Sequence, residues 1–122
     1  MKEVKKIVIA EDNSVFLMLI KFRLEKEGYK LFLAEDGKKA IELIEAHKPD
    51  LILTDIMMAF VNGLEVISHV RNKLKLKVPI IVFSASGQEE MVVKAFDLGA
   101  NGFMAKPLSP NELIIRVRRA LM

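Results

Sequence analysis

Strand-like apolar runs alternate with helix-like segments five times along this chain. The runs lie at Val4–Ala10, Lys30–Ala34, Leu51–Thr54, Pro79–Phe83 and Gly102–Ala105. Several of them lack the polar–apolar alternation of a half-exposed strand, which is typical of strands covered on both faces. The order predicts an α/β fold in which a five-stranded parallel sheet carries helices on both faces. A length of 122 residues fits one such domain, spanning residues 1–122.

Helix signals fall in the gaps between these runs. A first helix is expected at about Ser14–Glu27, with Gly28 at its end. Asp36 and Asn62 are placed to cap the next two helices. Gly99 falls where the fourth helix should stop. The last two helix starts have capping-box spacing, in the pairs Ser86 with Glu89 and Ser109 with Glu112.

Composition excludes several classes of protein. Without cysteine, the chain has no disulfide, thiolate metal site or cysteine nucleophile. The net charge of +3 is carried by scattered lysines and arginines, so we expect no nucleic-acid binding by this domain alone. No signal-peptide core follows the first residues, and the longest apolar stretches, Val15–Ile20 and Ile56–Val61, are too short to cross a bilayer. A cytoplasmic protein without membrane contact is therefore expected.

Side chains of complementary chemistry stand where four of the apolar runs end. Glu11 and Asp12 follow the first run, Asp55 the third, Ser84 the fourth and Lys106 the fifth. Because the carboxyl ends of parallel strands share one edge of a sheet, these groups should converge there. Crowded carboxylates repel unless a cation neutralises them, and an all-oxygen set suits Mg²⁺. The set predicts a metal-assisted phosphoryl-transfer site.

In this order, these residues resemble the receiver domain of two-component response regulators. The resemblance covers essentially the whole chain and favours a single-domain receiver of the chemotaxis type, with the flavodoxin-like, doubly wound (βα)5 fold. The segments that carry it are Glu11-Asp12, Leu51-Ile52-Leu53-Thr54-Asp55-Ile56-Met57-Met58, Asn62-Gly63, Ser84-Ala85, Gly99-Ala100-Asn101-Gly102-Phe103 and Lys106-Pro107.

The resemblance implies a role for each acidic residue. Asp55 is the expected phosphoacceptor, which attacks phosphorus to give an acyl phosphate. Asp12 is expected to bind Mg²⁺ directly and Glu11 through a water molecule. Asp55 itself and the backbone carbonyl of Met57 complete the expected metal ligands. The domain would then catalyse only its own phosphorylation and dephosphorylation, rather than act as an enzyme on other molecules.

The remaining roles concern stabilisation and switching. Lys106 and Ser84 are expected to contact the phosphoryl oxygens, since phosphoryl transfer depends on positioning and charge neutralisation. The resemblance implies a cis peptide bond between Lys106 and Pro107. It also makes Phe103 the aromatic switch, which turns inward when Ser84 moves, although an aromatic residue in a short strand is ordinarily core. Ala59 stands where the family usually has proline, which should loosen the loop after Asp55 without removing a reacting group.

The implied partners are a sensor histidine kinase or histidine phosphotransfer protein and an unknown downstream protein. The downstream protein is expected on the face made by the fourth helix, fifth strand and fifth helix. Alternatives stay open: a phosphate relay or sink, an output-less fragment of a longer regulator, or a receiver that binds partners without phosphorylation. A flavodoxin-like nucleotide binder would need Ser, Thr and Gly after the first strand to bind phosphate, whereas Glu11-Asp12 would repel it. A haloacid dehalogenase-type hydrolase would carry a DxD motif after the first strand, which here ends in Glu-Asp.

Overall fold

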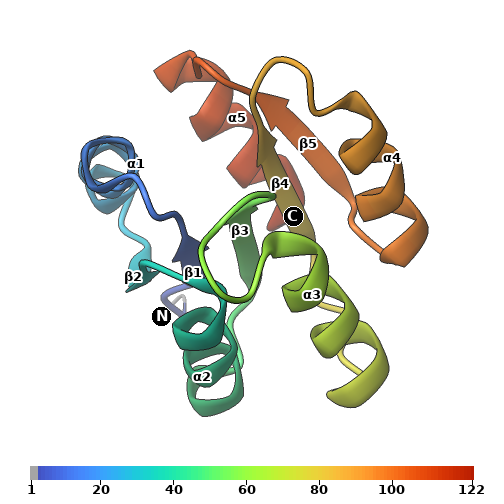
Figure 1. The fold of residues 1–122 in the computed structure, drawn as a ribbon. Helices are drawn as coiled ribbons and strands as arrows, with labels where there is room; N and C mark the ends of the chain where they lie inside the picture. The colour runs from blue at the N-terminus through green and yellow to red at the C-terminus, as the bar shows by residue number, and fades with distance from the viewer. Residues whose placement is uncertain (1–2) are drawn as a thin grey trace.

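The computed structural model describes residues 3–122, and its five strands form one parallel sheet with helices on both faces (Figure 1). The strands lie in the order β2-β1-β3-β4-β5, and every neighbouring pair is parallel. The expected doubly wound, flavodoxin-like fold is thereby confirmed. Strand order reverses between β1 and β3, and this is where sheets of this type bind ligands. The strands are β1 (Lys6–Ala10), β2 (Lys30–Ala34), β3 (Leu51–Asp55), β4 (Ile80–Ser84) and β5 (Gly102–Ala105).

Three strands differ from the prediction at one or both ends because pairing, and not apolar character, sets their bounds. Strand β3 extends one residue further than expected, to Asp55, which pairs with Phe83 on β4. Strand β1 begins at Lys6 rather than Val4, since its first partner on β2 is Lys30. Val4 lies outside the sheet and is 59% exposed. Strand β4 runs from Ile80 to Ser84, one residue later than expected, because Ser84 still pairs with Ala105 on β5. Ser84 is therefore the last residue of a strand and not a loop residue.

The helices confirm most of the predicted start signals. The side chain of Asp36 accepts a hydrogen bond from the Lys39 amide, and Asn62 and Glu65 form a reciprocal capping box. Ser109 caps the last helix as expected. The helices are α1 (Ser14–Lys26), α2 (Gly37–His47), α3 (Gly63–Ser68), α4 (Glu89–Leu98) and α5 (Pro110–Ala120), with a π-helical segment η1 (His69–Lys73) that continues α3.

The fourth helix begins later than the sequence predicted. The spacing of Ser86 and Glu89 indicated a capping box, but α4 starts at Glu89 and its N-cap residue is Gln88. The N-cap side chain makes no hydrogen bond to the helix. The loop between Ser84 and Glu89 uses its polar groups differently, as described below.

Each face of the sheet has its own apolar core. Helices α1 and α5 cover one face, where Leu17, Leu113 and Val117 pack with strand residues such as Phe83. Helices α2, α3 and α4 cover the other face, with Ile67 among the buried side chains (Figure 1). Within residues 3–122, none of the helices has the length and hydropathy needed to span a lipid bilayer.

Candidate functional site

Three carboxylates meet at the carboxyl end of the sheet, as the strand order requires. Glu11 and Asp12 follow β1, and Asp55 ends β3, the strand beside it. One oxygen from each carboxylate lies within 4.8 Å of the others. Glu11 is fully buried, Asp55 is 6% exposed and Asp12 is exposed to solvent. An all-oxygen cluster of this size fits a hard divalent cation such as Mg²⁺, with one side open to the solution.

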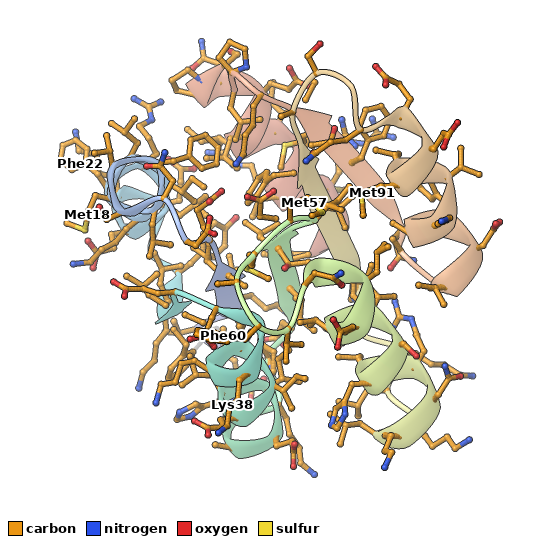
Figure 2. The ribbon with its side chains drawn as sticks, viewed as in Figure 1. Met18, Phe22, Lys38, Met57, Phe60 and Met91 are labelled. Carbon is orange, nitrogen blue, oxygen red and sulfur yellow. The ribbon has the colours of Figure 1, made fainter. Side chains whose placement is uncertain are left out.

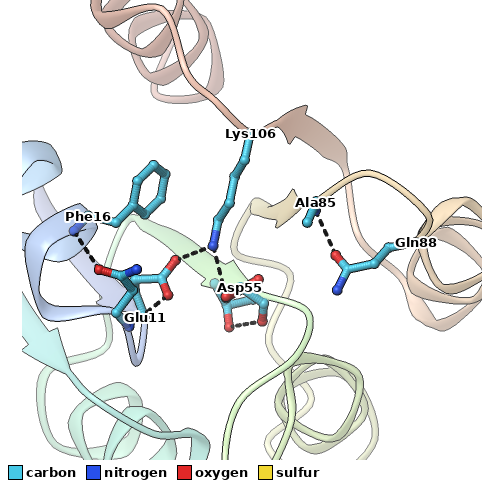
Figure 3. A network of polar contacts seen from close by, with 8 residues as sticks. Glu11, Phe16, Asp55, Ala85, Gln88 and Lys106 are labelled. Atoms are coloured by element: carbon cyan, nitrogen blue, oxygen red, sulfur yellow. Dashed lines mark hydrogen bonds and ion pairs between the residues drawn. The ribbon is translucent and has the colours of Figure 1, made fainter.

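Lys106 places its ammonium group between two of the carboxylates. Its Nζ atom lies 2.8 Å from Oε1 of Glu11 and 3.0 Å from Oδ2 of Asp55 (Figure 3). The same ammonium group lies 4.6 Å from the centre of the Phe16 ring, a cation–π contact. The Lys106 amide donates to the carbonyl of Ser84 at 2.8 Å, and the peptide bond to Pro107 is cis. The lysine is therefore held by backbone pairing as well as by its charge.

Burial and charge shift two pKa values in the site. Burial raises the pKa of Glu11, and the nearby charge of Asp55 acts in the same direction. Hydrogen bonds from Lys106 and from the Asn13 amide oppose this rise but do not cancel it. For Lys106, burial lowers the pKa, but the hydrogen bonds and charges of Glu11 and Asp55 outweigh it and leave the pKa raised. The Lys106 side chain is therefore protonated and positively charged beside Asp55 at neutral pH.

The loop after β3 folds tightly back on Asp55. The Gly63 amide donates to the Ile56 carbonyl at 2.8 Å, and a Cβ atom at Gly63 would lie 2.2 Å from the carbonyl oxygen of Asp55. Only glycine fits this approach. Met57, two residues after Asp55, is 46% exposed, and Phe60 is 90% exposed with a positive φ of 65°. Both residues lie on the loop after β3, with Met57 near the end of the strand and Phe60 nearer to α2 (Figure 2).

A pocket lies beside the site, between strand β5, the end of β4 and the first residues of α4. It has a volume of about 380 Å³, and Ser84, Phe103 and Lys106 are among its lining residues. Ser84 is 6% exposed, whereas Phe103 is 42% exposed and packs edge-to-face against Phe96 at 6.3 Å between ring centres. In this structure Phe103 therefore points outward, with space between its ring and Ser84.

Three contacts in the site were not anticipated from the sequence. Asn13 donates its amide to Glu11 at 3.0 Å, and Phe16 packs against the lysine ammonium group. Gln88 accepts a hydrogen bond from the Ala85 amide at 2.7 Å. The apolar spacing of α1 and the Ser86–Glu89 spacing each offered a simpler local interpretation, so the sequence carried no separate signal for these contacts.

Comparison with known proteins gives consistent matches. The model of the response regulator receiver domain matches residues 7–118. A curated relative, the alkaline phosphatase synthesis transcriptional regulatory protein PhoP of Bacillus subtilis (strain 168), is 38% identical over 117 residues, which cover 96% of this chain. The chain spans only 48% of the length of that relative.

Solved structures give the same match at the level of the fold. The receiver domain of the Francisella response regulator 1452 superposes with a TM-score of 0.86 at 31% identity, covering 96% of both chains. A CheY-like response regulator receiver domain protein from Methanospirillum hungatei JF-1 superposes with a TM-score of 0.91 at 27% identity, covering 98% of this chain and 94% of the other.

Proposed function

The chain belongs to the response regulator receiver domain family of two-component signalling, and on this premise we propose that Asp55 accepts a phosphoryl group from a phosphohistidine donor. In the proposed step, a carboxylate oxygen of Asp55 forms a bond to phosphorus while the bond from phosphorus to the imidazole nitrogen breaks. The electron pair of that bond stays with the imidazole, which takes up a proton. The observation that carries the proposal is the position of Asp55, which is buried, hydrogen-bonded to Lys106 and clustered with two further acids.

The surrounding residues supply charge neutralisation. Lys106 is already 3.0 Å from Asp55 and would follow the negative charge onto the phosphoryl oxygens. The hydroxyl group of Ser84 would donate to another of these oxygens. Glu11, Asp12, Asp55 and the Met57 carbonyl would hold Mg²⁺, and the donor set of the acidic cluster fits this ion. When bound, Mg²⁺ would neutralise the acids and the incoming phosphate charge.

The exposed side of α1 supports docking of a protein donor beside Asp55. Helix α1 follows Asp12 directly and exposes four large apolar side chains: Val15, Met18, Leu19 and Phe22. Met18 and Phe22 project away from the sheet (Figure 2). An exposed apolar patch of this kind suits a protein partner. We assign it to the histidine kinase or histidine phosphotransfer protein that brings the phosphohistidine.

The output of the proposed switch lies on the face formed by α4, β5 and α5. Phosphorylation acts at a distance only if it biases an element with two arrangements. The pocket between Ser84 and Phe103 gives the aromatic ring a second position. Movement of Ser84 toward the phosphoryl group would let Phe103 turn inward and change the surface near the exposed Ile115, where a downstream protein would bind.

Labelling with acetyl phosphate tests the acceptor. The protein is incubated with acetyl phosphate and Mg²⁺, and its intact mass should increase by one phosphoryl group. Asp55→Asn keeps the size of the side chain but removes the attacking charge, so it should gain none. Asp97→Asn, an exposed aspartate on α4, is the matched control and should label normally. Labelling of Asp55→Asn at another position would show that the acceptor is misassigned, and continuous turnover without an adduct would indicate a hydrolase.

A further inference from the structure

Gln88 and Ala85 close the loop after β4 with a reciprocal pair of hydrogen bonds. The Ala85 amide donates to Oε1 of Gln88 at 2.7 Å, and the Gln88 amide donates to the Ala85 carbonyl at 3.3 Å. Gly87, with φ of +88°, provides the turn between them. Gln88 is the N-cap residue of α4, yet its side chain bonds to Ala85 and not to the helix.

The Ala85 amide is a hydrogen-bond donor to which an oxygen of a phosphoryl group on Asp55 could bond. Ala85 directly follows Ser84, and both residues line the same pocket as Lys106. In Figure 3 the Gln88 amide group extends from α4 toward Asp55 and meets Ala85 on that side. The hydrogen bond from a backbone N–H to an anionic oxygen is stronger than the hydrogen bond from the same N–H to a neutral amide oxygen. In the unphosphorylated protein, the neutral side-chain oxygen of Gln88 therefore accepts the hydrogen bond of the Ala85 amide at the edge of the acceptor site.

We infer that Gln88 is a positioning residue that competes with the phosphoryl group for the Ala85 amide. The inference rests on the proposed function, since it requires an anionic group on Asp55. Before phosphorylation, the Gln88 side chain holds the loop in its present form. When a phosphoryl oxygen takes the Ala85 amide, Gln88 is displaced and the N-terminal end of α4 loses this attachment.

The two ends of α4 are held by different contacts, so displacement of Gln88 should affect the N-terminal end of the helix more than its C-terminal end. At the C-terminal end, Gly99 adopts a left-handed conformation, and Arg71 donates to the Gly99 carbonyl from both Nε and Nη2. Arg71 also bonds Asn101, whose side chain accepts from the Ile80 amide. At the N-terminal end, the cap residue makes no side-chain bond to the helix. Loss of the side-chain contact therefore removes one of the two Gln88–Ala85 hydrogen bonds at the end of α4 nearest the site, whereas Arg71 still holds the far end.

Beryllofluoride, a phosphoryl mimic, tests the inference when titrated with Mg²⁺ into the wild type and two Gln88 variants. Gln88→Ala removes the competitor, so beryllofluoride should bind about fivefold more tightly, the factor expected when one ordinary hydrogen bond no longer has to be broken. Gln88→Glu keeps an acceptor for Ala85 and adds a negative charge, so binding should be weaker than in the wild type. Glu90→Ala, at an exposed neighbouring position on α4, is the control, and its affinity for beryllofluoride should stay close to that of the wild type.

The Ala85 amide resonance reports directly on its hydrogen bond to Gln88, while the change in beryllofluoride affinity separates competition from a purely structural role. In the free protein the Ala85 amide proton should move upfield in Gln88→Ala, which lacks the acceptor, and downfield in Gln88→Glu, whose carboxylate is a stronger acceptor than the amide oxygen. Beryllofluoride should shift it in the wild type. If the wild type binds no beryllofluoride, the proposed function itself fails. If the wild type binds but Gln88→Ala binds equally or more weakly while remaining folded, the proposed function stands and the role of Gln88 is overturned.

Discussion

Lys106 and Glu11 form an ion pair of 2.8 Å in which the carboxylate is fully buried. Removing the lysine would leave a buried charge without its cation, next to the charge of Asp55. Buried pairs are costly to break, and because the Lys106 side chain keeps 23% exposure we expect Lys106→Met to lower the free energy of unfolding by about 2 kcal/mol. Urea denaturation measures this loss.

A second substitution identifies the cause of that loss. Combining Lys106→Met with Glu11→Gln removes the orphaned charge, so the double variant should recover most of the lost stability. Lys94→Met, at an exposed position on α4, is the control and should change little. If the double variant is no more stable than Lys106→Met, packing of the lysine stem and not the buried charge would account for the loss.

Asp12→Ala should separate metal binding from folding. Without metal, removing one of three clustered carboxylates relieves repulsion, so the variant should be at least as stable as the wild type. In Mg²⁺ at roughly ten times a millimolar dissociation constant, the wild type should gain about 1.4 kcal/mol by mass action. The variant should gain almost none and should not be phosphorylated. Thermal unfolding in EDTA and in Mg²⁺ measures both effects, and a large loss of melting temperature in EDTA would mean that Asp12 is structural.

Phe103→Ala should uncouple phosphorylation from the distant surface. The variant keeps every acid and Lys106, so it should still bind beryllofluoride at Asp55. In the wild type, amide shift changes should extend through α4 to Ile115 and Arg119 and be smaller in α2. In Phe103→Ala, the changes at Ile115 and Arg119 should shrink, whereas Phe22→Ala on α1 should leave them intact. Changes confined to the loops of the site in the wild type would instead favour a phosphate relay or sink.

Arg71 should contribute strongly to stability although it lies far from the acids. Its guanidinium group donates to the carbonyls of Gly99 and Leu76 and to the side chain of Asn101. Hydrogen bonds from a charged donor are worth roughly 1.5–3 kcal/mol, so Arg71→Met should lower the free energy of unfolding by about 2 kcal/mol. Lys73→Met, an exposed cation in the same π-helical segment, is the comparison. Equal effects of the two substitutions would rule out a specific role for the Arg71 contacts.

Tyr29 gives a prediction that depends on pH. Burial is the largest effect and raises the pKa of Tyr29 above the ordinary value of 10.0. The charge of Arg118 lowers this pKa and the charge of Glu27 raises it, and both effects are smaller than that of burial. A group whose pKa is raised by folding stabilises the fold below its unfolded pKa, and this contribution is lost as the pH rises through the folded value. The chain has one tyrosine and no tryptophan, so tyrosinate absorbance reports this group alone. The midpoint should lie above pH 10 in the folded protein and fall in concentrated urea.

Changing Arg118 tests the direction of the neighbouring charges. Arg118 also forms an ion pair with Glu27. Arg118→Met removes the charge that lowers the Tyr29 pKa and leaves Glu27 unpaired, and both effects should move the Tyr29 midpoint to still higher pH. A midpoint that falls in this variant would contradict the assignment.

From the amino-acid sequence follow the alternation of strands and helices, the parallel sheet, and the meeting of the acids at one of its edges. Asp12, Asp55 and Lys106 stand at the ends of separate strands, and in a parallel sheet those ends share one edge whatever the loop details. Local caps such as Asn62 and Ser109 were also predicted correctly, because their partners lie three residues away in the chain.

For other polar groups, the packing of the helices on the sheet selected one partner among several that the sequence offered. Ser86 had the right spacing to cap α4, but the turn at Gly87 brings the Gln88 side chain to the Ala85 amide instead. The contact between Arg71 and Gly99 joins residues 28 positions apart, so no local pattern marks it. Spacing along the chain identifies groups that are able to bond, whereas packing of the helices on the sheet fixes the distances that select among them.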